Sequence, residues 1–111
     1  MRKTREQTLI SNIIIAYCAD YKRRKAAILD GSYSRRVIME YRYINSRLYD
    51  AAAEIVGSYY AERMIEEIGG SVGYTRSAIM NLSEVAYKKY KARIKLLMAK
   101  KLYLIDSVKK E

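Results

Sequence analysis

The sequence predicts an all-α fold, a compact bundle of four to five helices of which two or three are long and amphipathic. Apolar residues recur at helical spacing through most of the chain, and no Pro interrupts these runs. Half of the 111 residues are apolar and 31% are charged, which is the composition of a globular protein. We therefore expect a single helical domain over residues 1–111.

The stretch from Val37 to Tyr60 is predicted to be the central helix against which the other elements pack. Its apolar residues recur in alternating steps of four and three, so they share one helix face. The main row is Val37, Tyr41, Ile44, Leu48, Ala51 and Ile55, and a second row is Ile38, Ala52 and Val56. Gly57-Ser58 marks a break, because Gly weakens a helix and Ser58 can cap the short helix expected at Tyr59–Ile68.

A first helix is predicted from about Thr4 to Leu29, and Asp30-Gly31 should end it because Gly accepts the left-handed conformation. Ser32 or Ser34 can cap the helix that follows. The basic start resembles a secretory signal, but the apolar run Ile13–Ala19 is far too short to span a bilayer and the helical spacing continues past it. We expect a cytoplasmic protein in which the lone Cys18 is a core residue.

The last helix is predicted to begin at a Ser83 cap, after a short helix at Tyr74–Leu82. Its apolar side is expected to consist of Ala86, Tyr90, Ile94, Leu97, Met98, Leu102 and Ile105. On this pattern Tyr90 belongs to the core and Tyr87 to its rim.

The net charge of +10 is concentrated in the two terminal thirds of the chain, while residues 37–82 are mildly acidic. Such segregation favours a polyanionic partner, and nucleic acid is the first choice. Phosphate contacts are expected from basic residues of the first helix, of the start of the second and of the last, where Tyr87 and Tyr90 are interleaved with lysines. These are Arg23, Arg24, Lys25, Arg35, Arg36, Lys88, Lys89, Lys91, Arg93 and Lys95.

The segment Arg63–Leu82 has the outline of a helix-turn-helix, within residues 59–82: a helix, a Gly-centred turn and a second helix with polar residues near its start. Ser71, Tyr74, Thr75, Arg76 and Ser77 would then face the major groove. Through the stretches Arg35–Ile44 and Glu66–Ile79, the chain resembles small phage-type transcriptional regulators with a sigma-like helix-turn-helix domain, the ArpU and RinA kind. The resemblance implies a DNA-binding regulator from a phage or mobile element.

Enzymatic residues are not indicated. The chain has no His, which is the commonest acid–base group and metal ligand. Asp50 with Glu54, and Glu62 with Glu66, share helix faces, but Arg47 and Arg63 lie three residues before Asp50 and Glu66 and favour surface ion pairs. The glycines at 69, 70 and 73 match no phosphate-loop pattern. We expect no catalytic residue, cofactor or metal site.

The sequence thus favours a small basic nucleic-acid-binding protein, with DNA ahead of RNA. The alternative is an interaction module or inhibitor that binds an acidic protein surface or a nucleoprotein complex of the host. Membrane binding is disfavoured, because the apolar face of the last helix has no Trp or Phe and is needed for the core. Long apolar stripes in so small a chain also suggest a homodimer.

Overall fold

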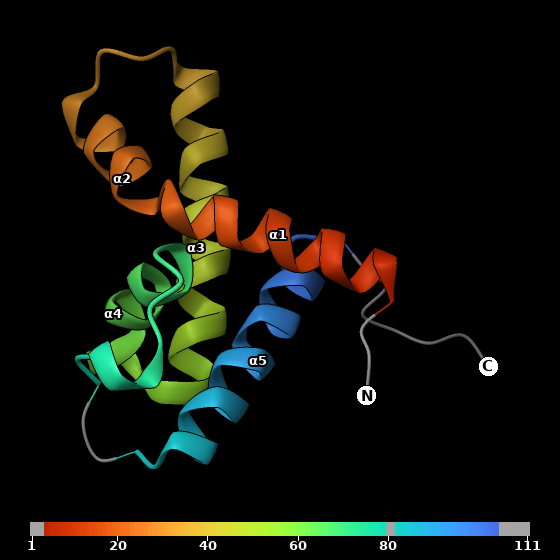
Figure 1. Cartoon of the computed structure of the whole chain (residues 1–111). Helices are drawn as coiled ribbons and strands as arrows, with labels where there is room; N and C mark the ends of the chain where they lie inside the picture. The colour runs from red at the N-terminus through yellow and green to blue at the C-terminus, as the bar shows by residue number, and fades with distance from the viewer. Residues whose placement is uncertain (1–3, 80–81, 105–111) are drawn as a thin grey trace.

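A computed structural model describes residues 4–79 and 82–104, and over these ranges the chain is all-α (Figure 1). The helices are α1 Arg5–Ala19, α2 Tyr21–Asp30, α3 Arg35–Val56, α4 Ser58–Gly69 and α5 Glu84–Lys101, with a 3-10 turn, η1 Tyr74–Arg76, between the last two. The predicted fold class is confirmed. Ile105 lies outside the described residues. No helix in the described part of the chain is long and apolar enough to cross a membrane.

The central helix is α3, as the apolar stripe predicts. It packs against α2, α4 and α5 and buries Leu48, Ala51 and Ala52 completely. Ser34 caps its start by accepting the Val37 N–H at 3.3 Å, and Gly57, with a φ of 85°, ends it. Gly57 also precedes α4 directly, so Ser58 is the first helical residue and makes no side-chain cap.

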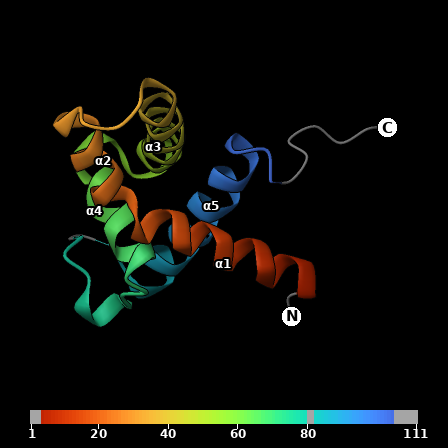
Figure 2. The same ribbon diagram turned by 90° about the horizontal axis from the view of Figure 1, so that it is seen from above.

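The core lies between α1, α4, α5 and the C-terminal half of α3, with α4 and α5 packed on α3 and α1 packed on α4 and α5 (Figures 1 and 2). Its fully buried side chains include Ile14 of α1, Ile65 of α4 and Ile94 of α5. Cys18 is also buried, with its Sγ 3.6 Å from Met98 Sδ, which confirms it as a core residue. Burial raises the pKa of the Cys18 thiol from 9.0 to about 12, so the group is a neutral apolar filler at physiological pH.

The expected single first helix is wrong: the chain turns at Asp20 and forms α1 and α2. Its start is as predicted, since Thr4 and Gln7 form a reciprocal capping box. At the turn, the Arg24 guanidinium donates to the Tyr17 carbonyl. A side chain inserted among the backbone hydrogen bonds of a helix bends the helix. Here the Arg24 side chain supplies the donor to the Tyr17 carbonyl at the turn. The end at Gly31, left-handed with a φ of 74°, is as predicted.

The expected short helix over Tyr74–Leu82 is also wrong within the described residues. Only the turn η1 forms, and Ser77 is extended, with φ −69° and ψ 142°. The cause is the buried carboxylate of Glu67, which accepts from Ser77 Oγ and from the Ala78 N–H, both at 2.7 Å. Because this carboxylate takes up the backbone donor, it holds the segment away from a helical path.

The same carboxylate reverses the predicted order of the two tyrosines in α5. Tyr87 is completely buried and Tyr90 only partly. The Tyr87 hydroxyl donates to Glu67 Oε1 at 2.7 Å, so the ring can enter the core without leaving a polar group unpaired. The Ser83 cap is as predicted, with Ala86 N–H to Ser83 Oγ at 3.1 Å.

Candidate nucleic-acid interface

Helix α2 and the first half of α3 form a helical hairpin that stands above α1 (Figure 1). A buried network fixes it to the body of the protein. Arg24, only 3% exposed, donates from Nε to Asn45 Oδ1 at 2.7 Å and from Nη2 to the Tyr17 carbonyl. Asn45 Nδ2 in turn donates to the Tyr21 carbonyl at 3.2 Å. Burial lowers the pKa of Arg24. Arg24, predicted to contact phosphate, is instead the residue that holds the hairpin in place.

The exposed cations of α2 are neutralised within the protein. Arg23 donates through two nitrogens to the Asp20 carboxylate, at 2.7 and 2.6 Å, and these bonds hold the pKa of Asp20 below its usual value. Lys25 Nζ lies 2.6 Å from Glu62 Oε2 of α4. Hydrogen bonds from Lys25, and then from the Tyr21 hydroxyl, lower the pKa of Glu62.

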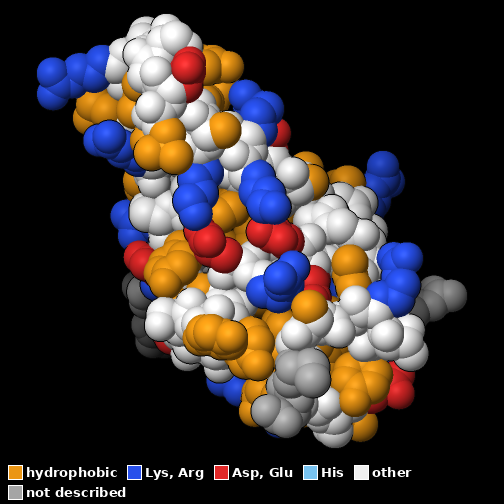
Figure 3. Space-filling model, turned by 90° about the vertical axis from the view of Figure 1, so that its left-hand side faces the viewer, with side chains coloured by type: hydrophobic (Ala, Val, Ile, Leu, Met, Phe, Trp, Pro, Cys, Tyr) orange, Lys and Arg blue, Asp and Glu red, His pale blue; other side chains and the backbone are white. Residues whose placement is uncertain are grey.

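A further pair joins Lys22 Nζ to Glu66 at 3.5 Å, and Arg63 also lies 3.7 Å from Glu66, as its spacing predicts. Figure 3 shows the side of the molecule that lies on the left in Figure 1. Near its middle, Lys and Arg side chains lie against carboxylates, whereas the part above carries Lys and Arg mixed with hydrophobic side chains.

Unpaired arginines lie on the outward face of the first half of α3. We call this surface the α3 outer face; it comprises Arg35, Arg36, Met39, Glu40, Arg42, Tyr43, Ser46 and Arg47. Within the described ranges, Arg35, Arg36 and Arg42 are exposed and make no hydrogen bond or ion pair. Long charged side chains without partners inside a protein are free to contact an anion at no cost in existing bonds.

Exposed aromatic rings accompany these arginines. The Arg47 guanidinium lies over the Tyr43 ring, 4.7 Å from its centroid, rather than pairing with Asp50 as the spacing suggests. Tyr33, in the turn between α2 and α3, has its ring centroid 6.0 Å from that of Tyr41. Tyr33 remains 43% exposed and Tyr43 41%. The hairpin therefore presents arginines and aromatic rings together.

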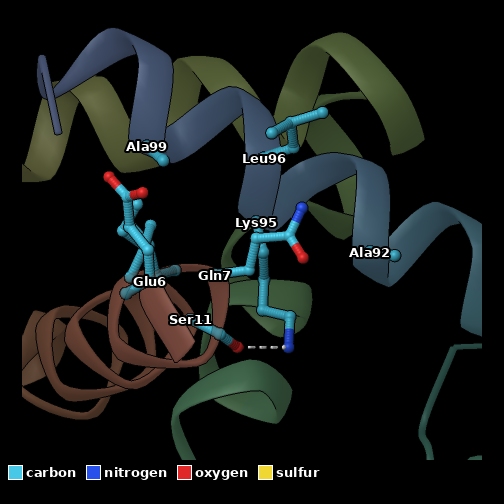
Figure 4. A pocket seen from close by; sticks show the side chains of 9 residues that line it. Glu6, Gln7, Ser11, Ala92, Lys95, Leu96 and Ala99 are labelled. Carbon is cyan, nitrogen blue, oxygen red and sulfur yellow. Dashed lines mark hydrogen bonds between the residues drawn. The ribbon is translucent and has the colours of Figure 1, made fainter. Parts of the chain in front are cut away.

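Three of the five cations expected to form a basic face on α5 have partners within the protein. Lys88 pairs with Glu84 at 2.9 Å. Lys91 Nζ donates to the Val72 carbonyl at 2.5 Å, and burial lowers the pKa of Lys91. Lys95 Nζ donates to Ser11 Oγ at 3.1 Å (Figure 4). Of the five predicted cations, Lys89 and Arg93 remain exposed and unpaired in the described part of the chain.

The residues predicted to read bases lie in an irregular segment rather than on a helix. Ser71 has a φ of 54°, and the Tyr74 hydroxyl donates to the Leu82 carbonyl at 2.9 Å. Thr75 and Arg76 are exposed, but Ser77 is bound to Glu67. This segment lies at the opposite end of the molecule from the tip of the hairpin (Figure 1), so the structure does not bring the residues predicted to read bases together with the predicted cations of the hairpin. It does bring them beside α5, whose Lys91 donates to the Val72 carbonyl.

A groove of about 450 Å³ separates α1 from α5 (Figure 4). Its walls are mainly apolar, and it is lined by Glu6, Gln7, Ile10, Ser11, Ile14, Ala92, Lys95, Leu96 and Ala99. The exposed side chains of Leu9, Ile13 and Leu96 belong to the same two helices. The predicted homodimer is not tested by these contacts and stays a prediction.

Among the described residues, no group of three or more Cys, Asp or Glu side chains is placed to hold a metal ion.

Arg42, Arg47, Tyr33 and Tyr43 were not predicted as site residues. A count of charge by thirds of the chain hides Arg42 and Arg47 in the mildly acidic centre, and it takes no account of tyrosines. The spacing of Arg42 could have indicated it: Arg35 and Arg42 are seven residues apart, on the side of the helix opposite the apolar stripe.

Comparisons with models of protein families, with curated proteins and with solved structures found no match for this chain.

Proposed function

We propose that this protein binds nucleic acid, DNA ahead of RNA, through the α3 outer face. The observation that carries the proposal is the set of exposed, unpaired arginines, Arg35, Arg36 and Arg42, on one helix that projects from the body. Arginine donors in this state suit phosphate oxygens, which supply most of the affinity of non-specific nucleic-acid binding. The net charge of +10 attracts the polyanion over a longer range.

A regulatory role in a phage or mobile element belongs to the same proposal. The stretch Arg35–Ile44, one of the two that resemble phage-type regulators, is the stretch that forms most of the α3 outer face. The proposal does not include base reading by the second helix of a helix-turn-helix, because Tyr74–Arg76 is a single 3-10 turn. The proposal therefore places binding on the hairpin and expects affinity to depend more on salt than on base sequence.

The test compares two triple variants that remove the same charge. Arg35→Gln/Arg36→Gln/Arg42→Gln alters the α3 outer face, and Arg76→Gln/Lys89→Gln/Arg93→Gln removes three exposed cations elsewhere. Affinity for a labelled random 30-base-pair duplex, for the matching single-stranded DNA and for RNA is measured by fluorescence anisotropy at several salt concentrations. We expect the first triple to lower affinity about tenfold or more and to reduce the slope of log K against log salt by roughly two to three.

The second triple should retain most of the affinity. Equal losses in the two triples would show that net charge, not the α3 outer face, determines binding. No binding of the unaltered protein to any of these nucleic acids at low salt would overturn the proposal and direct attention to an acidic protein surface as the partner.

A further inference from the structure

We infer that the hairpin binds nucleic acid as a single strand, with unpaired bases stacked on Tyr33 and Tyr43 and the neighbouring arginines on the phosphates. The inference rests on the proposed function and adds the form of nucleic acid that the surface fits. It comes from the placement of the two exposed rings, which phosphate binding alone does not require.

Tyr43 lies between cations along one row of α3. Arg36, Tyr43 and Arg47 occupy positions i, i+7 and i+11, which fall on the same side of a helix. Arg47 lies over the Tyr43 ring, yet the side chain remains 41% exposed. A ring with a guanidinium on either side along the row can stack with a base while the arginines contact the phosphates that flank it.

Tyr33 is held at the tip of the hairpin rather than free in a loose connection. Gly31 begins the turn with a left-handed φ of 74°, the Ser32 hydroxyl donates to the Asp30 carboxylate, and Ser34 caps α3. The ring packs on Tyr41, whose own ring has the Arg23 guanidinium 5.3 Å from its centroid. Because the ring is already supported, little side-chain entropy would be lost when a base stacks on it.

Duplex DNA cannot use these rings in the same way. Its bases are stacked on one another and present only their edges in the grooves, whereas a single strand can turn its base faces outward onto aromatic side chains. Two exposed rings on the hairpin that carries the unpaired arginines therefore favour the single strand. Stacking is tolerant of sequence, because every base has a π face, so little base preference is expected.

The experiment measures the affinity of a labelled 30-nucleotide oligo(dT) and of a random 30-base-pair duplex at one salt concentration. The variants are Tyr33→Leu, Tyr43→Leu and the double variant. Tyr59→Leu is the control, since Tyr59 is 87% exposed but lies at the start of α4, beyond the far end of α3. With a rise of 1.5 Å per residue along α3, that end is roughly 33 Å from the tip of the hairpin and roughly 20 Å from Tyr43. Melting curves confirm that each variant is folded.

We expect the double variant to lose about tenfold or more in affinity for oligo(dT) and less than about twofold for the duplex. Tyr33→Phe/Tyr43→Phe, which keeps the rings, should retain binding to oligo(dT). Equal losses for the two nucleic acids, or no loss for either, would overturn the single-strand inference and leave the arginine-dependent binding intact. If the unaltered protein binds neither nucleic acid, the proposed function itself fails.

Discussion

At the scale of the residue, Arg24 and Glu67 show how a small basic protein can bury charge. Each side chain is surrounded by groups that complement it: Arg24 by Asn45 and the Tyr17 carbonyl, Glu67 by Ser77 and Tyr87. A buried charge without such partners would cost several kcal/mol, on the order of the net stability of a domain. The two residues each tie together elements that apolar packing alone would leave loosely placed.

Gly69 is the residue at which the structure tolerates least change. A Cβ added there would lie 2.5 Å from the backbone nitrogen of Ala19 and 2.7 Å from its Cα, because α4 ends directly against the end of α1. These neighbours are backbone atoms, so the helices would have to separate. We expect Gly69→Ala to lower the free energy of unfolding by about 1–3 kcal/mol, measured by urea denaturation.

Gly70→Ala is the matched control for this variant. Its added Cβ would approach Glu66 O at 3.3 Å and Val72 Cγ2 at 3.6 Å, which is tight but leaves room for a small adjustment. A loss of stability in Gly70→Ala as large as that in Gly69→Ala would show that glycine flexibility in the turn, rather than the approach of α1 to α4, is the cause.

At the scale of the element, the Glu67 carboxylate determines the path between α4 and α5. The segment has little regular structure of its own, and the bonds from Ser77, Ala78 and Tyr87 fix it to α4. We expect Glu67→Gln to loosen it, because the amide has one acceptor oxygen in place of two and its NH₂ group would face donors. Limited trypsin digestion should then cleave faster after Arg76, which is exposed.

Glu66→Gln serves as the control for this digestion. Glu66 is the preceding residue in α4, but it pairs with the surface cations Lys22 and Arg63, so the loss of its charge leaves the segment anchored. If cleavage after Arg76 is unchanged in Glu67→Gln, or rises equally in Glu66→Gln, the carboxylate does not hold the segment.

The elements also show which features the sequence could predict. Apolar periodicity located α3, and Ser34, Gly57 and Ser83 gave helix boundaries, because caps and stripes are local signals. The turn at Asp20, the absence of a helix after Tyr74 and the burial of Tyr87 depend on contacts of Arg24 and Glu67 with distant residues. Spacing alone predicts such charged residues to be at the surface.

The candidate site could be predicted only in part for a related reason. A count of charges treats every Lys and Arg as available, and Arg35 and Arg36 were found in this way. The count could not distinguish them from Lys25, Lys88 and Lys91, which have partners within the protein. Pairing across helices becomes visible only when the fold is known.

At the scale of the whole molecule, the arrangement of charge separates a paired region from an unpaired one. The acidic side chains of α4 face the cations of α2, in the pairs Lys25–Glu62 and Lys22–Glu66. The arginines of the α3 outer face have no such counterparts within the described residues. Helix α4 therefore limits how much of the hairpin's positive charge is available to a partner. The same ion pairs help to hold α2 against the rest of the protein.

Removing the acidic partners on α4 should therefore raise the affinity for nucleic acid and lower the stability of the fold. In Glu62→Gln/Glu66→Gln, Lys22 and Lys25 lose their acidic partners. Both lysines belong to the hairpin that carries the α3 outer face, so we expect affinity for oligo(dT) to rise several-fold at low salt. The pairs are partly exposed and each contributes no more than about 1 kcal/mol, so the melting temperature should fall by only a few degrees. Anisotropy titrations and thermal melts of one preparation measure both quantities.

Glu6→Gln/Glu84→Gln removes the same charge far from the hairpin, at the starts of α1 and α5. If net charge alone governed binding, the two double variants would gain equally. We expect the α4 variant to gain more, because it releases cations on the hairpin itself rather than across the molecule. Screening at physiological salt weakens the interaction between exposed charges that lie more than about 8 Å apart. A gain that is equal in the two variants, or that persists undiminished at high salt, would contradict the view that α4 regulates the hairpin by pairing its charges.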